Sequence, residues 1–150
     1  YLSTGSILPF MTVEAKIGWF RHRVIAEGVE YPVVSGRRGW LSVVDSRGGA
    51  TRVRYDGLRD RIHIEGPDGS LEIRIRSLRD TTFQWRGHVY RIASKLSGRI
   101  IIYEDERVAA EGKLTSSGRW VFEFFSPTLR SIERELVLGL AMRPSMMFLT

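Results

Sequence analysis

Residues 126–144 read SPTLRSIERELVLGLAMRP, and this stretch decides the fold that we expect for the whole chain. Ser126 followed by Pro127 is typical of a helix start, because the serine hydroxyl can accept a backbone N–H and proline has no N–H to lose. Leucine and isoleucine then recur at helical spacing until Pro144 ends the pattern, which predicts a helix over about 128–142. The charged side chains of its first two turns are expected to reach solvent: Arg130, Glu133, Arg134 and Glu135.

The second half of this helix, residues 136–142, is apolar on every side. A helix of that kind must be surrounded by protein or lipid. The stretch is far shorter than the ~20 residues of a membrane span, so we expect no transmembrane segment. Gly139 and Ala141 would let neighbouring side chains approach closely. A helix threaded through a closed β-barrel meets these conditions, and the alternative is a helix that lies across an open sheet or in the groove of a partner.

The sequence upstream, over about 10–125, indicates short strands. Valine, isoleucine and aromatic residues alternate with polar residues, and turn-forming pairs such as Asp56-Gly57 interrupt them at roughly ten-residue intervals. Many short strands with short connections favour a meander, and closure would remove the exposed edges. The sequence therefore predicts a mainly β fold, in which a closed antiparallel barrel of about 12 short strands surrounds one apolar C-terminal helix.

Length and composition are those of one globular domain. With 150 residues, 43% hydrophobic and 27% charged, the chain can bury a core of ordinary size. We expect residues 1–9 to be an N-terminal extension or an expression remnant, and 10–150 to be a single domain. No cysteine is present, which excludes disulfides, thiolate metal sites and cysteine nucleophiles and favours a cytoplasmic location.

A series of short strands with Gly-rich turns, followed by the run from Glu135 to Met142, resembles the tubby C-terminal-like superfamily. This superfamily includes tubby domains, phospholipid scramblases and LURP-one-related proteins. The chain is similar to a compact bacterial member over about 10–143. The resemblance implies a 12-stranded barrel around a buried helix and no enzymatic activity. Tubby domains bind phosphoinositide headgroups through basic surface residues, but no motif here matches that site residue by residue. The cysteine-rich segments of scramblases are missing, which argues against lipid scrambling.

No pattern in the sequence indicates catalysis, a cofactor or a metal. The histidines His22, His63 and His88 are isolated and lie on expected strands, without the spacing of metal ligands. Nucleophile-elbow, phosphate-loop and dinucleotide-binding motifs do not occur. The tryptophans are dispersed and are expected in the core, and Phe83 and Trp85 are the candidates for stacking on a nucleic acid base. We therefore expect a non-enzymatic protein without a cofactor.

The number and spacing of the arginines are the most informative feature of the sequence for function. The net charge is +6, and all 23 basic residues except Lys16, Lys95 and Lys113 are arginine, whose planar fork suits phosphate and carboxylate. Arginines repeat as Arg-x-Arg on neighbouring strands. If residues 66–69 form a hairpin loop, His63 lies opposite Glu72, Arg61 opposite Arg74, and Arg59 opposite Arg76. Like charges in such pairs are destabilising unless an anion neutralises them. The predicted anion-binding residues are Arg52, Arg54, Arg59, Arg61, Arg74 and Arg76.

Three functions remain open from the sequence. The first is a binding module whose arginine-rich strands contact anionic phospholipid headgroups, which would place the protein at the periphery of a membrane. The second is a scaffold that docks on other proteins, including acidic ones, and the third, less favoured, is a nucleic-acid-binding barrel. The competing interpretation of the arginines is a solvated surface partly offset by Glu14, Glu65 and Glu72, in a protein whose arginine content reflects a GC-rich genome.

Overall fold

The computed structural model describes residues 11–17, 22–44, 50–75, 81–95 and 98–143. These residues form thirteen strands, two short 3-10 helices and one α-helix. The elements, in chain order, are β1 (Met11–Ile17), β2 (His22–Ala26), β3 (Val29–Tyr31), β4 (Val33–Ser35), η2 (Arg37–Gly39), β5 (Leu41–Val44), β6 (Ala50–Asp56), β7 (Arg61–Gly66), β8 (Gly69–Arg74), β9 (Thr81–Trp85), β10 (His88–Lys95), β11 (Arg99–Glu104), β12 (Arg107–Leu114), β13 (Arg119–Phe124), η3 (Pro127–Leu129) and α1 (Glu133–Met142). The mainly β prediction with one C-terminal helix is confirmed.

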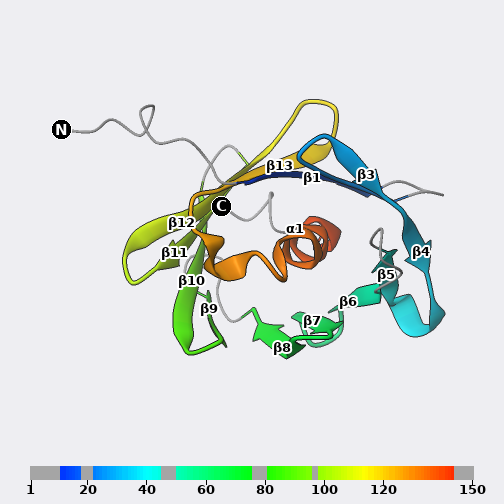
Figure 1. The fold of residues 1–150 in the computed structure, drawn as a ribbon, viewed down its shortest axis with the longest axis horizontal. Coiled ribbons are helices and arrows are strands. Elements are labelled where there is room, and N and C mark those ends of the chain that lie inside the picture. Colours follow the sequence, from blue (N-terminus) through cyan, green and yellow to red (C-terminus); the bar gives the residue numbers. More distant parts are fainter. Residues whose placement is uncertain (1–10, 18–21, 45–49, 76–80, 96–97, 144–150) are drawn as a thin grey trace.

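The strands build two antiparallel sheets that curve around α1 (Figure 1). One sheet has eight strands in the order β3-β2-β1-β13-β12-β11-β10-β9, and the other has five in the order β4-β5-β6-β7-β8. Within the described residues, no hydrogen-bonded ladder joins β8 to β9, and at the other end the two sheets meet in the segment 29–35, where β3 pairs with β2 and β4 pairs with β5. Pro32, which has no N–H to donate, separates β3 from β4. The described strands therefore form two sheets and not the continuous closed ladder of the expected barrel.

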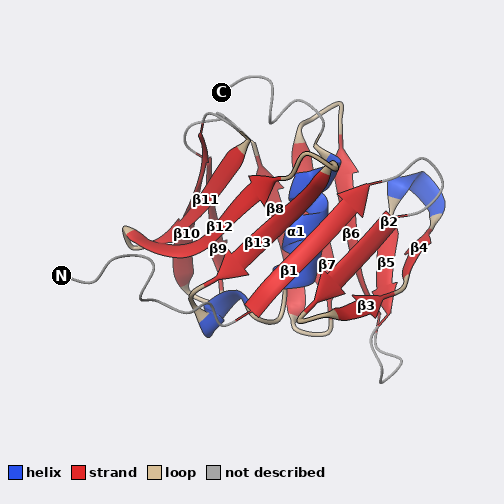
Figure 2. Cartoon of the chain, turned by 90° about the horizontal axis from the view of Figure 1, so that it is seen from above, coloured by secondary structure: helices blue, strands red, loops and turns tan. Residues whose placement is uncertain are grey.

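The apolar helix is enclosed, as its composition predicts. It packs against β1 and β2 of the larger sheet and against β6 and β7 of the smaller one. Figure 2 shows it behind β1 and β13, which cross it at an angle. Leu136, Val137, Leu138 and Leu140 are fully buried. The expected close approach at Gly139 is confirmed, because a Cβ built there would lie 2.7 Å from Cγ2 of Ile62. The core therefore consists of α1 and the inner faces of both sheets.

The beginning of the helix differs from the prediction of 128–142. Ser126 does accept a hydrogen bond from the backbone N–H of Thr128 through its Oγ, at 3.4 Å, but the turn that it caps is η3. The α-helix begins at Glu133, after a further turn. The expected exposure of Glu133 and Glu135 is wrong: both are buried, because this first turn already lies between the sheets, whereas Arg130 is exposed as expected.

Candidate functional site

The outward side chains of β6, β7 and β8 carry most of the predicted arginines. Alternation along each strand turns the isoleucines inward, so Arg52, Arg54, Arg61 and Arg74 project from the outer surface, which we call the arginine face. The predicted register is confirmed, since Arg61 lies opposite Arg74 and His63 lies opposite Glu72. Arg76 lies outside the described residues, and with it the expected pairing of Arg59 and Arg76.

Glu72 offsets part of the charge of the pair Arg61 and Arg74 from within the protein. Its Oε1 lies 3.0 Å from Nε of Arg74 and 3.2 Å from a terminal nitrogen of Arg61, and its Oε2 lies 3.7 Å from Nδ1 of His63. The hydrogen bond from Arg74, with the charges of Arg61 and His63, holds the pKa of the Glu72 carboxyl below its usual range. Arg61 and Arg74 therefore share one carboxylate, which reduces the repulsion between them.

Arg52 is also held by neighbours of its own. One guanidinium nitrogen lies 2.7 Å and 3.0 Å from the two carboxylate oxygens of Glu65, and the guanidinium carbon lies 4.3 Å from the ring centre of Trp40. The expected offset by Glu65 and Glu72 is thus confirmed. That by Glu14 is wrong, because Glu14 lies on β1 of the other sheet and pairs with Arg119.

The aromatic residues are not distributed between the core and the surface as the sequence predicted. Trp85 and Trp120 are buried, as expected for core residues, but Trp40 lies on the arginine face beside Arg52 and His63. Trp19 lies outside the described residues. The suggestion that Phe83 and Trp85 offer a stacking surface is wrong, because both side chains are buried.

Five arginines lie at one end of the smaller sheet, and three of them have no carboxylate partner among the described residues. The strand register places η2, the turn between β6 and β7, the start of β7 and the end of β8 at this end of the sheet. We call it the basic end. Among the described residues, Arg37, Arg38 and Arg59 are exposed and form no ion pair with an acidic side chain. The basic end consists of Arg37, Arg38, Arg59, Arg61 and Arg74, together with Leu58.

Two aspartates at the basic end are already engaged. Oδ1 of Asp56 accepts hydrogen bonds from the backbone N–H groups of Leu58 and Arg59, at 3.1 Å and 3.4 Å. Asp60 receives two hydrogen bonds from the buried guanidinium of Arg143, both at 2.7 Å. The turn between them holds the side chain of Leu58 entirely in solvent, with a relative exposure of 100%.

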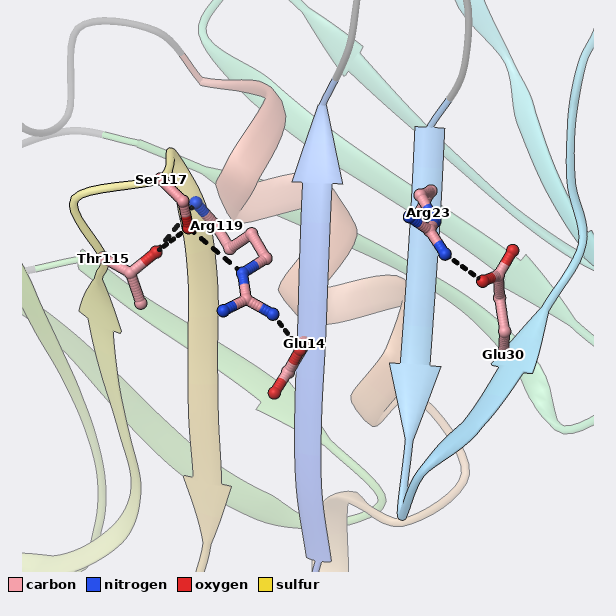
Figure 3. A network of polar contacts seen from close by, with 6 residues as sticks. All are labelled: Glu14, Arg23, Glu30, Thr115, Ser117 and Arg119. Carbon is pink, nitrogen blue, oxygen red and sulfur yellow. Dashed lines mark hydrogen bonds and ion pairs between the residues drawn. The ribbon is translucent and has the colours of Figure 1, made fainter.

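On the outer surface of the larger sheet several arginines form ion pairs, whereas Arg107 at the start of β12 forms none with a described acidic residue. Figure 3 shows Arg119 of β13 bound to Glu14 of β1 at 3.1 Å, and Arg23 of β2 bound to Glu30 of β3. Arg119 also donates to Oγ of Ser117, and Arg99 pairs with Glu111 on the neighbouring strand. Cross-strand pairing of opposite charges stabilises a sheet, and these residues have a sufficient structural role.

The sequence interpretation missed Leu58, Arg37, Arg38 and Trp40. An apolar residue at the centre of the turn Asp56-Gly57-Leu58-Arg59-Asp60 was the available signal, because turn positions are exposed and leucine there has no structural use. The histidines lie apart on β2, β7 and β10, and within the described part of the chain no group of acidic and histidine side chains could hold a metal ion. No helix in that part has the length and apolarity to cross a membrane.

No protein family model matches the sequence, and neither a curated protein nor a solved structure matches the chain. The interpretation of the site depends on its geometry.

Proposed function

We propose that this chain is a non-enzymatic binding module, built on a tubby-like barrel around α1, that contacts anionic membrane lipid through its basic end. The observation that carries the proposal is the combination of Leu58, fully exposed at the tip of a turn, with Arg37, Arg38 and Arg59, which have no acidic partner among the described residues. A peripheral position at the cytoplasmic surface of a membrane is part of this proposal. Pairing of β1 with β13 and enclosure of α1 support the barrel, and the described strands lack a hydrogen-bonded ladder between β8 and β9 that would close it.

A membrane would stabilise both the arginines of the basic end and Leu58. Each arginine near an anionic surface contributes ~1 kcal/mol of attraction. Removal of a leucine side chain from water contributes roughly 1.5–3 kcal/mol, and the acyl boundary of a bilayer offers an apolar place for Leu58. A nucleic acid would attract the arginines in the same way but offers Leu58 no comparable environment, so the leucine favours lipid over nucleic acid.

The structure also changes which arginines should be tested. Arg61 and Arg74 hold Glu72, so their replacement alters the sheet as well as its charge. Leu58→Ser combined with Arg59→Gln alters one exposed turn. The matched control is Val108→Ser combined with Arg107→Gln, which removes one exposed apolar and one exposed basic residue from β12 of the larger sheet.

Sedimentation with phosphatidylcholine vesicles, with and without phosphatidylserine, at low and physiological salt, tests the proposal. We expect binding to the anionic vesicles that weakens as salt screens the charges. The turn variant should bind about tenfold more weakly or worse, and the control variant should bind as the unmodified protein does. Absence of binding at low salt would contradict the proposal and favour the scaffold. A gel shift with nucleic acid that depends on Arg59 and not on Leu58 would contradict it in favour of the third function.

A further inference from the structure

The three lysines of the chain all lie at one end of the larger sheet. Lys16 is next to last in β1, Lys95 is the last residue of β10, and Lys113 is next to last in β12. These three strands run in the same direction, because every ladder of this sheet is antiparallel and one strand separates each of them from the next. All three side chains are exposed, and we call these residues the lysine edge.

Each lysine lies beside a like charge on a neighbouring strand. The directly opposite pairs are Lys16 with Arg23, Lys16 with Arg119, Lys95 with Arg99, and Lys113 with Arg99. Like charges in such positions destabilise a sheet. The stability of the sheet therefore does not explain why the chain places its lysines here.

The arginines of these pairs have acidic partners, whereas the lysines have none. Glutamates bind all three arginines: Glu14 binds Arg119, Glu30 binds Arg23, as Figure 3 shows, and Glu111 binds Arg99. No lysine of the lysine edge forms an ion pair with an acidic side chain of the described residues. An anionic partner could therefore engage the lysines without breaking an ion pair of the protein.

The lysine edge and the basic end lie at the same end of the molecule, on opposite sides of α1. β1 begins at Met11, which lines a small cavity together with Glu133, the first residue of α1, so Lys16 lies toward the other end of the helix. In the smaller sheet, Arg143 follows the last residue of α1 and binds Asp60 of the basic end. Figure 2 shows the arrowheads of β1 and β6 on the same side of the molecule. Cations of both sheets thus border the C-terminal end of α1.

The other end of the molecule carries charges of both signs. Exposed acidic residues in the turns at that end are Glu27, Asp68, Asp105 and Glu106. Exposed cations near them are Arg86, Arg107 and Arg130, and the first of these pairs with Asp68. Positive charge is therefore concentrated at the C-terminal end of α1.

We propose that the chain docks end-on to an anionic membrane, with the C-terminal end of α1 toward the lipid and the lysine edge as a second contact besides the basic end. This inference rests on the proposed function. A bilayer surface is extended, so it can engage cations on both sides of α1 at once, whereas a small anion would reach only one side. The long lysine side chains can extend past the strand ends toward the headgroups.

The size of the molecule makes this orientation testable. Arg107 and Lys113 lie near opposite ends of β12, about 20 Å apart at the usual rise of a strand. Salt screens charges beyond about 8 Å at physiological ionic strength. A lysine near the anionic surface strengthens binding roughly fivefold, so three together contribute tenfold or more, and cations at the other end contribute little.

Two triple variants with the same net charge separate the two ends. Lys16→Gln, Lys95→Gln and Lys113→Gln are combined in the first, and Arg86→Gln, Arg107→Gln and Arg130→Gln in the control. In sedimentation with phosphatidylserine-containing vesicles at physiological salt, the lysine variant should bind about tenfold more weakly or worse, and the control should change less than about twofold. Urea unfolding establishes that both variants are folded.

Fluorescent labels report the orientation directly, because the chain has no cysteine of its own. A label on Ser116→Cys, in the exposed turn that follows the lysine edge on β12, should be quenched by vesicles that carry a nitroxide on the lipid headgroup. A label on Val89→Cys, which is half-exposed near the start of β10 at the other end, should not be quenched.

The outcomes distinguish this inference from the proposed function. Absence of vesicle binding by the unmodified chain would contradict both. If Leu58→Ser with Arg59→Gln weakens binding but the lysine variant behaves as the control does, or if both labels are quenched equally, the end-on orientation is overturned and the proposed function stands. Loss of a duplex DNA gel shift in the lysine variant, with vesicle binding unchanged, would assign the lysine edge to nucleic acid and overturn the inference.

Discussion

Replacement of Gly139 by alanine tests how closely α1 approaches the smaller sheet. The added Cβ would lie 2.7 Å from Cγ2 of Ile62 and 3.1 Å from Cγ2 of Val53, both on fully buried side chains. Carbon atoms in contact normally lie about 3.5–4.0 Å apart. One of the elements must therefore move by roughly 1 Å, and neither neighbour is the flexible end of a long side chain.

Two opposing effects set how much the Gly139→Ala substitution changes the free energy of unfolding. Overpacking a core costs about 1–3 kcal/mol, whereas alanine is about 1 kcal/mol more favourable than glycine inside a helix. With contacts this short, the steric cost exceeds the gain in helix propensity. We expect the free energy of unfolding to fall by about 1–2 kcal/mol.

Urea unfolding followed by tryptophan fluorescence measures the change. Gly57→Ala, in an exposed turn without positive φ, is the matched control and should lie within about 0.5 kcal/mol of the unmodified chain. In an Ile62→Ala background, which lacks the obstructing Cγ2, Gly139→Ala should lose at least half of its effect. A Gly139→Ala variant as stable as the unmodified chain would refute the close approach of α1 and β7.

Three further predictions concern buried charge. Leu138→Asp should prevent folding, because it places an unpaired carboxylate on the fully buried part of α1, and a soluble variant that unfolds cooperatively would contradict the enclosure of the helix. Burial raises the pKa of Glu133 to about 7, so its carboxyl holds a proton in the folded chain at pH values where the unfolded chain has released it. The free energy of unfolding should therefore fall as the pH rises from about 4.5 to about 7. The Glu133→Gln variant should lack this fall and be more stable than the unmodified chain at pH 8 by on the order of 2 kcal/mol. Parallel pH profiles of the two proteins would contradict this role of Glu133. Hydrogen bonds from Arg143 hold the pKa of Asp60 below its usual range, so the stabilisation is present above about pH 4 and is lost as the pH falls through the lowered pKa. Asp60→Asn, which tolerates the positive φ at this position, should cost about 1–2 kcal/mol at pH 7 and progressively less as the pH falls below about 4. An equal cost at every pH would show that the ion pair is not the cause.

The β7–β8 register and the enclosure of α1 could be predicted because each depends on a pattern of residues that are close together in the sequence. Residues 66–69 form a tight turn, and a two-residue period on either side fixes which residues lie opposite one another. The helix is apolar all round beyond Glu135, and this leaves burial as its only stable environment. The two-residue period also predicts which side chains of each strand point inward.

What the sequence did not reveal depends on depth and on neighbours far along the chain. A helical period shows that Glu133 and Glu135 share a turn, but not that this turn already lies between the sheets. The bond from Thr51 to Glu135 joins residues 84 positions apart, and no local pattern contains it. The same holds for the hydrogen bonds from Arg143 to Asp60, which join residues 83 positions apart.

The pairing of β1 with β13 has a consequence for biosynthesis. Met11 lies opposite Phe124, so the central ladder of the larger sheet cannot form until more than a hundred residues separating the two strands have been made. α1 is synthesised later still, and until it arrives the inner faces of both sheets have no helix to cover them. A nascent chain would thus carry open strand edges and exposed isoleucines through most of translation. Such a chain is expected to fold slowly and to depend on protection from aggregation.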